Sequence, residues 1–404
     1  QTIGDLLKKY NRFMPIPIKF GTKEISKKEG EGKKEKEVKE SVDNIINITD
    51  PAWTKNPKDL KEDDYKGFYK DLYPMNFEDP LFNIHLNVDY PFNLTGILYF
   101  PKITNDINLQ KDKIQLYQNQ VFVTDNVEGI VPEFLTLLRG VIDSPDIPLN
   151  VSRSYLQVDS AVKKISNYIT RKVADKLNSL FKKDRKKFEE KWNDIKVIIE
   201  YGMLSEDKFF EKSDNFSLYP TTDNNFYTYD ELIKKIEKQH TDKDGKTIIL
   251  YTSNVEEQDS YIKEANKKGY TVLLLDSPII SHLIQKLETS KEKISFTRVD
   301  SDAIENLIKK DIKNVSKLND KEQEKLKSQI EEVVPKEKYT IQLQAMDSDA
   351  LPLIITEPEF MRRMKDMQNS GGNSMFGNMP EIHNLIVNTN NELVIGIFNS
   401  KTKN

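Results

Sequence analysis

Few side chains in this 404-residue chain have the types and spacing that an active site needs. Cysteine does not occur, which excludes disulfides, thiolate metal sites and a cysteine nucleophile. The chain also has neither a GxSxG nucleophile elbow nor a glycine-rich phosphate loop. A zinc-binding HExxH helix is excluded as well, because the four histidines lie far apart: His85, His240, His282 and His383. The residue types alone therefore identify no self-contained enzyme active site.

The most unusual segment is residues 125–157, DNVEGIVPEFLTLLRGVIDSPDIPLNVSRSYLQ. Within it, Arg153 follows a proline-led turn and comes just before a long helical pattern. A long cationic side chain on a loop tip can reach across a domain interface, and an arginine that caps or pairs at a helix start fits the same pattern. Upstream, Asp143 and Asp146 flank another proline turn, and we interpret them as turn-capping residues.

A second unusual segment, residues 356–380, joins a methionine-rich helix to a glycine loop. Its apolar side chains at i, i+4 and i+7 share one helical face: Phe360, Met364 and Met367. Arg362 and Arg363 make the rest of that helix polar. Because methionine is flexible and polarizable, the apolar face can adapt to many partners; packing on a neighbouring sheet is the alternative.

Composition limits the classes of partner. The 61 basic and 65 acidic residues give a net charge of −4, which favours neither nucleic acid nor a membrane surface as partner. No apolar run approaches the roughly 18 residues of a transmembrane helix, and the lack of cysteine fits a reducing compartment. We therefore expect a cytoplasmic protein, and the length favours two or three domains.

Hydrophobic periodicity predicts the elements that position these segments. Residues 21–41 are nearly all Lys, Glu, Gly and Ser, which predicts a mobile, solvated loop. Beyond it we expect a helix over residues 63–72 and then strands in FNIHLNV, LTGILYFP and KIQLYQNQVFVTD. Residues 132–143 predict a compact amphipathic helix. From Ser154 a helical pattern runs on for about 45 residues, with an apolar stripe at Val162, Ile165, Ile169, Val173, Leu177, Leu180 and Phe181.

The second half of the chain alternates strands and helices. Residues 246–300 predict a βαβαβ unit with a parallel sheet, and its first turn, YTSNVEEQ, contains no glycine for a nucleotide fingerprint. Residues 301–333 are highly charged and predict a helical linker. The patterns YTIQLQAM, LPLIIT and HNLIVNTNNELVIGIF predict strands, the last of them in ELVIGIF.

Four blocks of this sequence resemble the Hsp90 chaperone family, in family order. Residues 125–157 resemble the signature of the family's middle domain. The other three blocks are PAWTKNPKDLKEDDYKGFYK, FPKI and KIQLYQNQVFVTDN. The resemblance implies an α+β and α/β multidomain chain. In it, an α-β-α sandwich middle domain and helical connector precede a small βαβαβ unit and a partial α+β C-terminal domain. The implied divisions are residues 1–235, 236–315 and 316–404, the last without the family's final dimerisation helices.

The resemblance also implies roles for individual residues. Arg153 matches the arginine that reaches the ATP γ-phosphate, while Gln157 and Asn150 match its loop neighbours. Trp53 matches a surface tryptophan that contacts client proteins, although a half-buried packing residue is an equal alternative. Phe360, Met364 and Met367 match the family's client-contacting helix.

The resemblance implies further that ATP and Mg²⁺ bind in a nucleotide domain that nothing in this sequence resembles. The whole protein would form a homodimer and bind unfolded or partly folded clients. Two other readings stay open: a non-catalytic scaffold of the same ancestry, and a small-ligand enzyme built on the βαβαβ unit. The second lacks a phosphate loop and a clustered acid–base set.

Overall fold

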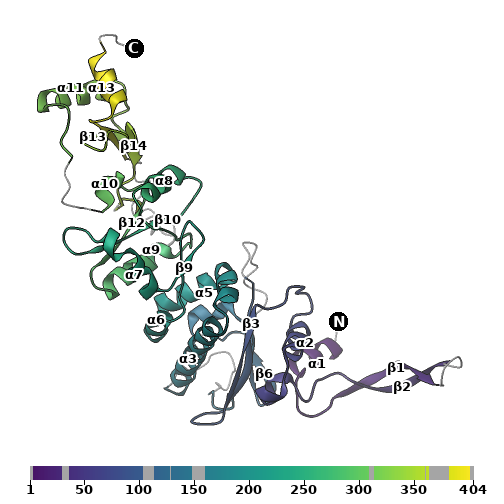
Figure 1. Cartoon of the computed structure of the whole chain (residues 1–404). Coiled ribbons are helices and arrows are strands. Elements are labelled where there is room, and N and C mark those ends of the chain that lie inside the picture. Colours follow the sequence, from purple (N-terminus) through teal and green to yellow (C-terminus); the bar gives the residue numbers. More distant parts are fainter. Residues whose placement is uncertain are drawn as a thin grey trace. The chain divides into compact units, whose positions relative to one another are not determined.

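The computed structural model describes residues 3–29, 36–102, 113–127, 129–147, 160–308, 314–359, 361–363 and 382–400. The chain divides into two compact units, Gln1–Ser213 and Asp214–Asn404 (Figure 1). Both units mix helices with small sheets, which confirms the predicted mixed α/β class. The boundary that we predicted after residue 235 falls inside helix α7 (Tyr229–His240), so it does not separate compact units.

The first unit begins with helix α1 (Ile3–Tyr10) and a long antiparallel hairpin of β1 (Lys19–Glu29) and β2 (Lys36–Ile45) (Figure 1). The mobile loop predicted over residues 21–41 is therefore wrong for its described part. The backbone groups of the two strands pair with each other, and oppositely charged side chains form diagonal ion pairs across the hairpin. Lys19 lies 2.6 Å from Asp43, and Lys39 lies 3.3 Å from Glu24. An apolar alternation is not needed for such a ribbon.

A five-stranded sheet forms the centre of the first unit, in the order β3-β4-β7-β5-β6. Its strands are β3 (Phe82–Val88), β4 (Leu94–Phe100), β5 (Ile114–Gln118), β6 (Val121–Thr124) and β7 (Arg139–Asp143). Strand β7 runs parallel to β5 and antiparallel to β4. The amphipathic helix predicted over residues 132–143 is therefore wrong: a short 3-10 turn, η4 (Glu133–Leu137), precedes β7. Gly140 permits this pairing, because a Cβ there would lie 2.0 Å from the carbonyl oxygen of Ile97.

Both faces of this sheet are covered. On one face, helix α2 (Glu62–Leu72) and the 3-10 turn η2 (Ala52–Thr54) pack over Ile97, Tyr99 and Val141. A third 3-10 turn, η3 (Pro57–Asp59), links η2 to α2. The alternate residues Leu98 and Ile142 point to the opposite face and are also fully buried. The central sheet is therefore buried on both faces.

The helical pattern predicted from Ser154 onward is divided into separate helices. They are α3 (Ser160–Lys183), α4 (Arg185–Glu190), α5 (Trp192–Ser205) and α6 (Asp207–Ser213) (Figure 1). Asp184 breaks the first of them, since its side chain accepts a hydrogen bond from the backbone N–H of Lys187 at 3.1 Å and caps α4. The predicted apolar stripe is buried from Val162 to Leu177, whereas Leu180 and Phe181 are only half-buried.

The second unit contains the predicted βαβαβ element, and its sheet is parallel in the order β11-β10-β12. A small hairpin, β8 (Tyr219–Pro220) and β9 (Phe226–Tyr227), precedes α7. The element comprises β10 (Thr247–Thr252), α8 (Asp259–Lys267), β11 (Val272–Leu274), α9 (Ile280–Ser290) and β12 (Ile294–Arg298), and α10 (Ile304–Leu307) follows it.

A further three-stranded sheet completes this unit, in the order β13-β15-β14. It consists of β13 (Tyr339–Gln344), β14 (Leu353–Thr356) and β15 (His383–Asn388), with helices α11 (Asp320–Glu331) and α13 (Glu392–Asn399) packed against it. The strand predicted in ELVIGIF is wrong, because these residues form α13. Asn391 caps that helix by accepting a hydrogen bond from the backbone N–H of Leu393 at 2.9 Å.

Candidate functional site

The residues with predicted chemical or client-binding roles fall mainly in two segments outside the described residues. Asn150, Arg153 and Gln157 lie in residues 148–159. Phe360, Met364 and Met367 also lie outside the described residues. The structure does describe the side chains that hold the ends of these two segments, and these side chains make up the candidate site.

The turn that precedes residues 148–159 makes hydrogen bonds to two other parts of the first unit, at Asn93 and at Gln118. The Ser144 hydroxyl donates to the carbonyl of Asn93 at 2.6 Å, and the backbone N–H of Asn93 donates to the Asp146 carboxylate at 2.6 Å. From the neighbouring strand, the Gln118 side-chain amide donates to the carbonyl of Pro145 at 3.0 Å. Asp146 therefore fastens the turn to a distant loop, where we had predicted only a local cap.

Asp143 directly precedes this turn, and Trp53 contacts Asp143. The Trp53 side chain is 0% exposed and packs edge-on against Phe13, with ring centroids 4.6 Å apart. Its indole N–H donates to the buried carboxylate of Asp143 at 3.3 Å. The client-contacting role predicted for Trp53 is thus corrected: the side chain belongs to the aromatic core between η2 and the sheet and is not exposed to a client.

Burial governs the ionisation of Asp143. It raises the pKa of the Asp143 carboxyl above its ordinary value, and hydrogen bonds from the backbone N–H of Gln120 and from Trp53 offset part of that rise. Both of these donors reach the same carboxylate oxygen. Among the described residues no cation pairs with Asp143, so these hydrogen bonds are the interactions that stabilise its charged form.

The far end of the 148–159 segment is the start of α3. This helix is fixed along the sheet by a fully buried stripe that begins with Val162 and Ile165. The residues on both sides of the twelve-residue interval are thus held by hydrogen bonds or by packing in the first unit.

The second segment begins at a charged cluster in the second unit. Arg363 donates to both carboxylate oxygens of Glu288, at 2.8 and 3.2 Å, and to the carbonyl of Phe296 at 2.6 Å. Arg362 is 2% exposed and bonds to Glu359 at 2.6 Å and to the hydroxyl of Tyr251. The sequence analysis assigned these two arginines to the polar part of the helix, and the structure buries or half-buries them among carboxylates.

The pKa values of the carboxylates reflect these contacts. Burial acts to raise the pKa of Glu288 and of Glu359, but other interactions outweigh it, and both pKa values lie below normal. For Glu288 these are contacts with Arg363 and the backbone N–H of Phe296, and for Glu359 they are contacts with Arg362 and Arg363. The start of the second segment is therefore locked to α9 and β12 through ionised pairs. The spacing of Glu359 to Arg363 signals a helical ion pair in the sequence, whereas Glu288 is too distant in the sequence to give a signal.

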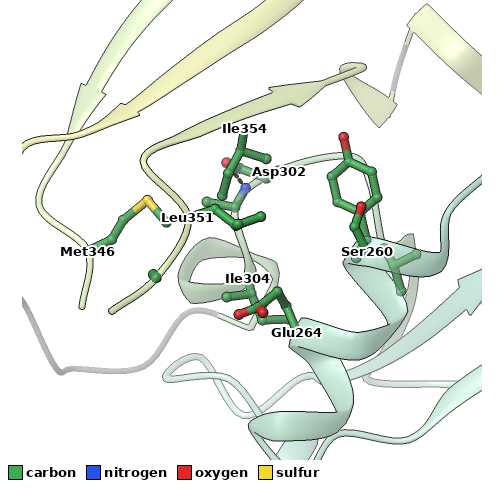
Figure 2. A pocket seen from close by; sticks show the side chains of 11 residues that line it. Ser260, Glu264, Asp302, Ile304, Met346, Leu351 and Ile354 are labelled. Atoms are coloured by element: carbon green, nitrogen blue, oxygen red, sulfur yellow. Dashed lines mark hydrogen bonds between the residues drawn. The ribbon is translucent and has the colours of Figure 1, made fainter. Parts of the chain in front are cut away.

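Two cavities lie near this cluster in the second unit. A polar cavity of about 380 Å³ opens at the ends of β10 and β12, but its Arg298 is already paired with Asp300 and Glu357 at 2.5 and 3.0 Å. Figure 2 shows the other cavity, where Ile304 faces Leu351 and Ile354. Its volume of about 20 Å³ holds roughly one water molecule, so it is a packing seam. Among the described residues, no three His, Asp or Glu side chains gather where they could hold a metal ion.

Comparison with known proteins decides the family. The family model described as "Hsp90 protein" matches residues 20–404. A protein named "Chaperone protein HtpG" from Bacteroides thetaiotaomicron is 53% identical over 97% of this chain, and the match covers 57% of that relative. Like-named proteins from Porphyromonas gingivalis and Clostridium acetobutylicum are 51% and 28% identical, over 98% and 97% of this chain and 57% and 62% of the relatives. This chain belongs to the Hsp90 family.

Hsp90 membership confirms the resemblance seen in the four sequence blocks. The chain spans a little over half of the length of the relatives it matches, 57% for the protein from Bacteroides thetaiotaomicron. None of the described helices is long and apolar enough to cross a membrane.

Proposed function

We propose that this Hsp90-family chain is part of an ATP-dependent molecular chaperone that works in the cytoplasm as a homodimer. In this proposal the chain binds unfolded or partly folded proteins and supplies Arg153 to the ATPase site. The support is the name "Chaperone protein" carried by relatives that are 51–53% identical over nearly the whole chain, together with the match of PLNVSRSYLQ to the family motif.

ATP and Mg²⁺ would bind in another part of a longer protein, since this chain corresponds to 57% of a relative's length. Arg153 would offset the negative charge that grows on the transferring phosphoryl group, as arginine fingers do. Gln157 would contact the same interface, and Asn150 would shape the loop. Cleavage of the bond between the β- and γ-phosphates of ATP, with transfer of the γ-phosphoryl group to water, would supply the free energy for the chaperone cycle.

One observation carries the catalytic part of this proposal. The described residues on both sides of residues 148–159 are held: Asn93 and Gln118 make hydrogen bonds to the preceding turn, and the following helix α3 is packed through a buried stripe. Fixed flanks would lower the entropic cost of presenting the Arg153 guanidinium to a phosphate.

The client-binding part of the proposal places Phe360, Met364 and Met367 on one apolar helical face. The ion pairs of Arg362 and Arg363 would hold the start of that face against the second unit. An adaptable methionine surface on a firm base suits partners of varied sequence.

Two assays test the proposal. The full-length protein is expected to hydrolyse ATP, whereas this chain alone is expected not to bind ATP tightly; tight binding by the chain alone would contradict the assignment. For the client surface, replacing Phe360, Met364 and Met367 together by serine is expected to reduce suppression of aggregation of a denatured protein. Met361→Ser, which lies off that stripe, is the matched control and is expected to retain the activity.

A further inference from the structure

An apolar cavity with a basic rim lies in the first unit, away from both segments discussed above. It occupies about 200 Å³ where the start of β3 meets the end of α3, helix α4 and the start of α5. Its lining residues are Phe82, Leu180, Lys183, Asp184, Lys187, Phe188, Lys191 and Ile195. We call it the lysine-rimmed cavity.

The floor of the lysine-rimmed cavity is apolar and preformed. Phe82 stacks on Phe100 with ring centroids 4.2 Å apart, Phe188 packs edge-on against Phe181 at 5.7 Å, and Ile195 is fully buried. A cavity of 150 Å³ lined by apolar side chains is known to bind benzene, so about 200 Å³ accommodates one phenyl-sized or branched aliphatic group. The same volume is too small for a long acyl chain.

The rim carries excess positive charge. Lys191 is held at the cavity edge because its ammonium donates to the carbonyl of Leu81 at 2.7 Å. Lys187 forms an exposed ion pair with Asp184 at 3.5 Å. Among the described residues, Lys183 has no carboxylate at ion-pair distance; its charge instead acts on Lys176, whose pKa is lowered by burial and by this neighbouring cation.

The local sequence departs from the chain as a whole. Residues 182–191 contain six basic and three acidic residues, while the complete chain has a net charge of −4. The three lining lysines recur every four residues, at the end of α3, in α4 and just before α5. An occupant with several separated negative charges around one apolar group would complement them.

We propose that the lysine-rimmed cavity binds a segment of a partner protein in which carboxylates flank a single aromatic or branched aliphatic side chain. The apolar side chain fills the space between Phe82, Phe188 and Ile195, and the carboxylates pair with Lys183 and Lys187. A peptide segment fits better than a fatty acid, because a fatty acid brings one carboxylate and a chain too long for the cavity. This surface is distinct from the proposed client face and does not depend on the role of Arg153.

Fluorescence anisotropy of a labelled acetyl-Asp-Asp-Phe-Asp-Asp-amide peptide with the full chain tests this proposal. Saturable binding is expected, and the double variant Lys183→Glu/Lys187→Glu is expected to weaken it by about tenfold or more at low salt. Lys182→Glu, an exposed neighbour outside the lining, is the matched control and is expected to leave binding within about twofold. A peptide with alanine in place of phenylalanine should bind more weakly, since the floor then stays unfilled.

Circular dichroism melts of each variant separate a loss of binding from a loss of folding. The proposal is overturned if no saturable binding occurs up to about 1 mM peptide. It is also overturned if an Asn-Asn-Phe-Asn-Asn peptide binds equally well, or if decanoate binds while the acidic peptide does not. An equal loss of peptide affinity in the double variant Lys183→Glu/Lys187→Glu and in Lys182→Glu would likewise contradict the proposal.

Discussion

The indole N–H of Trp53 donates to the carboxylate of Asp143 at 3.3 Å, across 90 residues of sequence. This contact links the turn η2 to the end of β7, the strand that leads into the loop with Arg153. Trp53 is therefore a structural support at the end of the strand that precedes residues 148–159.

Removing the indole donor is expected to destabilise the first unit. Trp53→Phe keeps an aromatic ring but leaves the buried Asp143 carboxylate with one donor fewer, and it opens a small cavity. The free energy of unfolding is expected to fall by about 2 kcal/mol. Urea unfolding followed by circular dichroism measures this. Phe77→Ala, at a side chain that is 90% exposed, is the control and is expected to change little. Equal stabilities of Trp53→Phe and wild type would show that the contact contributes nothing.

The raised pKa of Asp143 predicts a pH dependence. Burial makes the folded chain hold this proton more tightly than the unfolded chain does. This group therefore adds stability at low pH, and the contribution is lost as pH rises from about 4, the unfolded value, through the folded pKa. Unfolding free energies of wild type and Asp143→Asn, measured across that range, are expected to show a wild-type advantage that shrinks with rising pH. A difference that grows with pH would mean that the folded pKa is depressed.

Loss of Arg363 is expected to loosen the base of the proposed client segment. The backbone N–H of Phe296 donates to Glu288 at 2.6 Å, and Arg363 holds that carboxylate in place. Arg363→Ala should therefore lower the free energy of opening at the Phe296 amide, measured by hydrogen exchange, by about 2 kcal/mol. This value lies between the contributions to stability that are typical of exposed and of buried ion pairs.

The control for Arg363→Ala is Lys263→Ala, which removes an exposed ion pair with Asp259 on α8. Lys263→Ala is expected to change the free energy of opening at the Phe296 amide by less than about 1 kcal/mol. If both variants behave alike, the cluster at Arg363 gives no more stability than a surface pair.

The β1–β2 hairpin is expected to be dispensable for folding, because among the strands that the structure describes β1 and β2 pair only with each other. Replacing residues 23–42 by Asn-Gly, so that the paired Thr22 and Asp43 flank a tight turn, should change the unfolding free energy by less than about 1 kcal/mol.

The base of the hairpin behaves differently. The Asn47 side chain accepts a hydrogen bond from the backbone N–H of Ile18 and donates to the carbonyls of Met14 and Ile16, all within 2.8 Å. Asn47→Ala is therefore expected to cost about 1–3 kcal/mol in the same urea experiment. If the hairpin deletion lowers the unfolding free energy by several kcal/mol and Asn47→Ala leaves it unchanged, the hairpin strands and not their base stabilise the fold, contrary to this prediction.

Regular periodicity made much of the fold predictable. The βαβαβ unit and the helix α2 follow from apolar alternation and helical spacing, which depend on neighbours in the sequence. Strand β7 did not follow from its own pattern, because its inclusion in the sheet depends on β4 and on Gly140, which allows the close approach. The pattern of ELVIGIF predicted a strand, whereas these residues form α13, which Asn391 caps.

The candidate site was less predictable than the fold. The motif around Arg153 could be identified from the sequence, but the contacts of Asn93 and Glu288 with their partners join residues 53 and 75 positions apart. No local pattern encodes such pairs. The burial of Trp53 likewise depends on rings brought together from distant elements, such as Phe13 and Tyr117.

The most direct test of the central claim is ATP turnover by the full-length protein carrying Arg153→Ala. The charge that Arg153 would neutralise grows mainly in the transition state, so kcat is expected to fall while ATP affinity and folding stay near wild type. Arginine fingers contribute roughly 10³–10⁵ in rate, and a conformational step that limits turnover reduces the observed loss, so we expect a fall of at least about tenfold. Arg153→Lys should recover only part of the activity, because lysine lacks the planar fork. A folded Arg153→Ala protein that hydrolyses ATP at the wild-type rate would contradict the proposed role of Arg153.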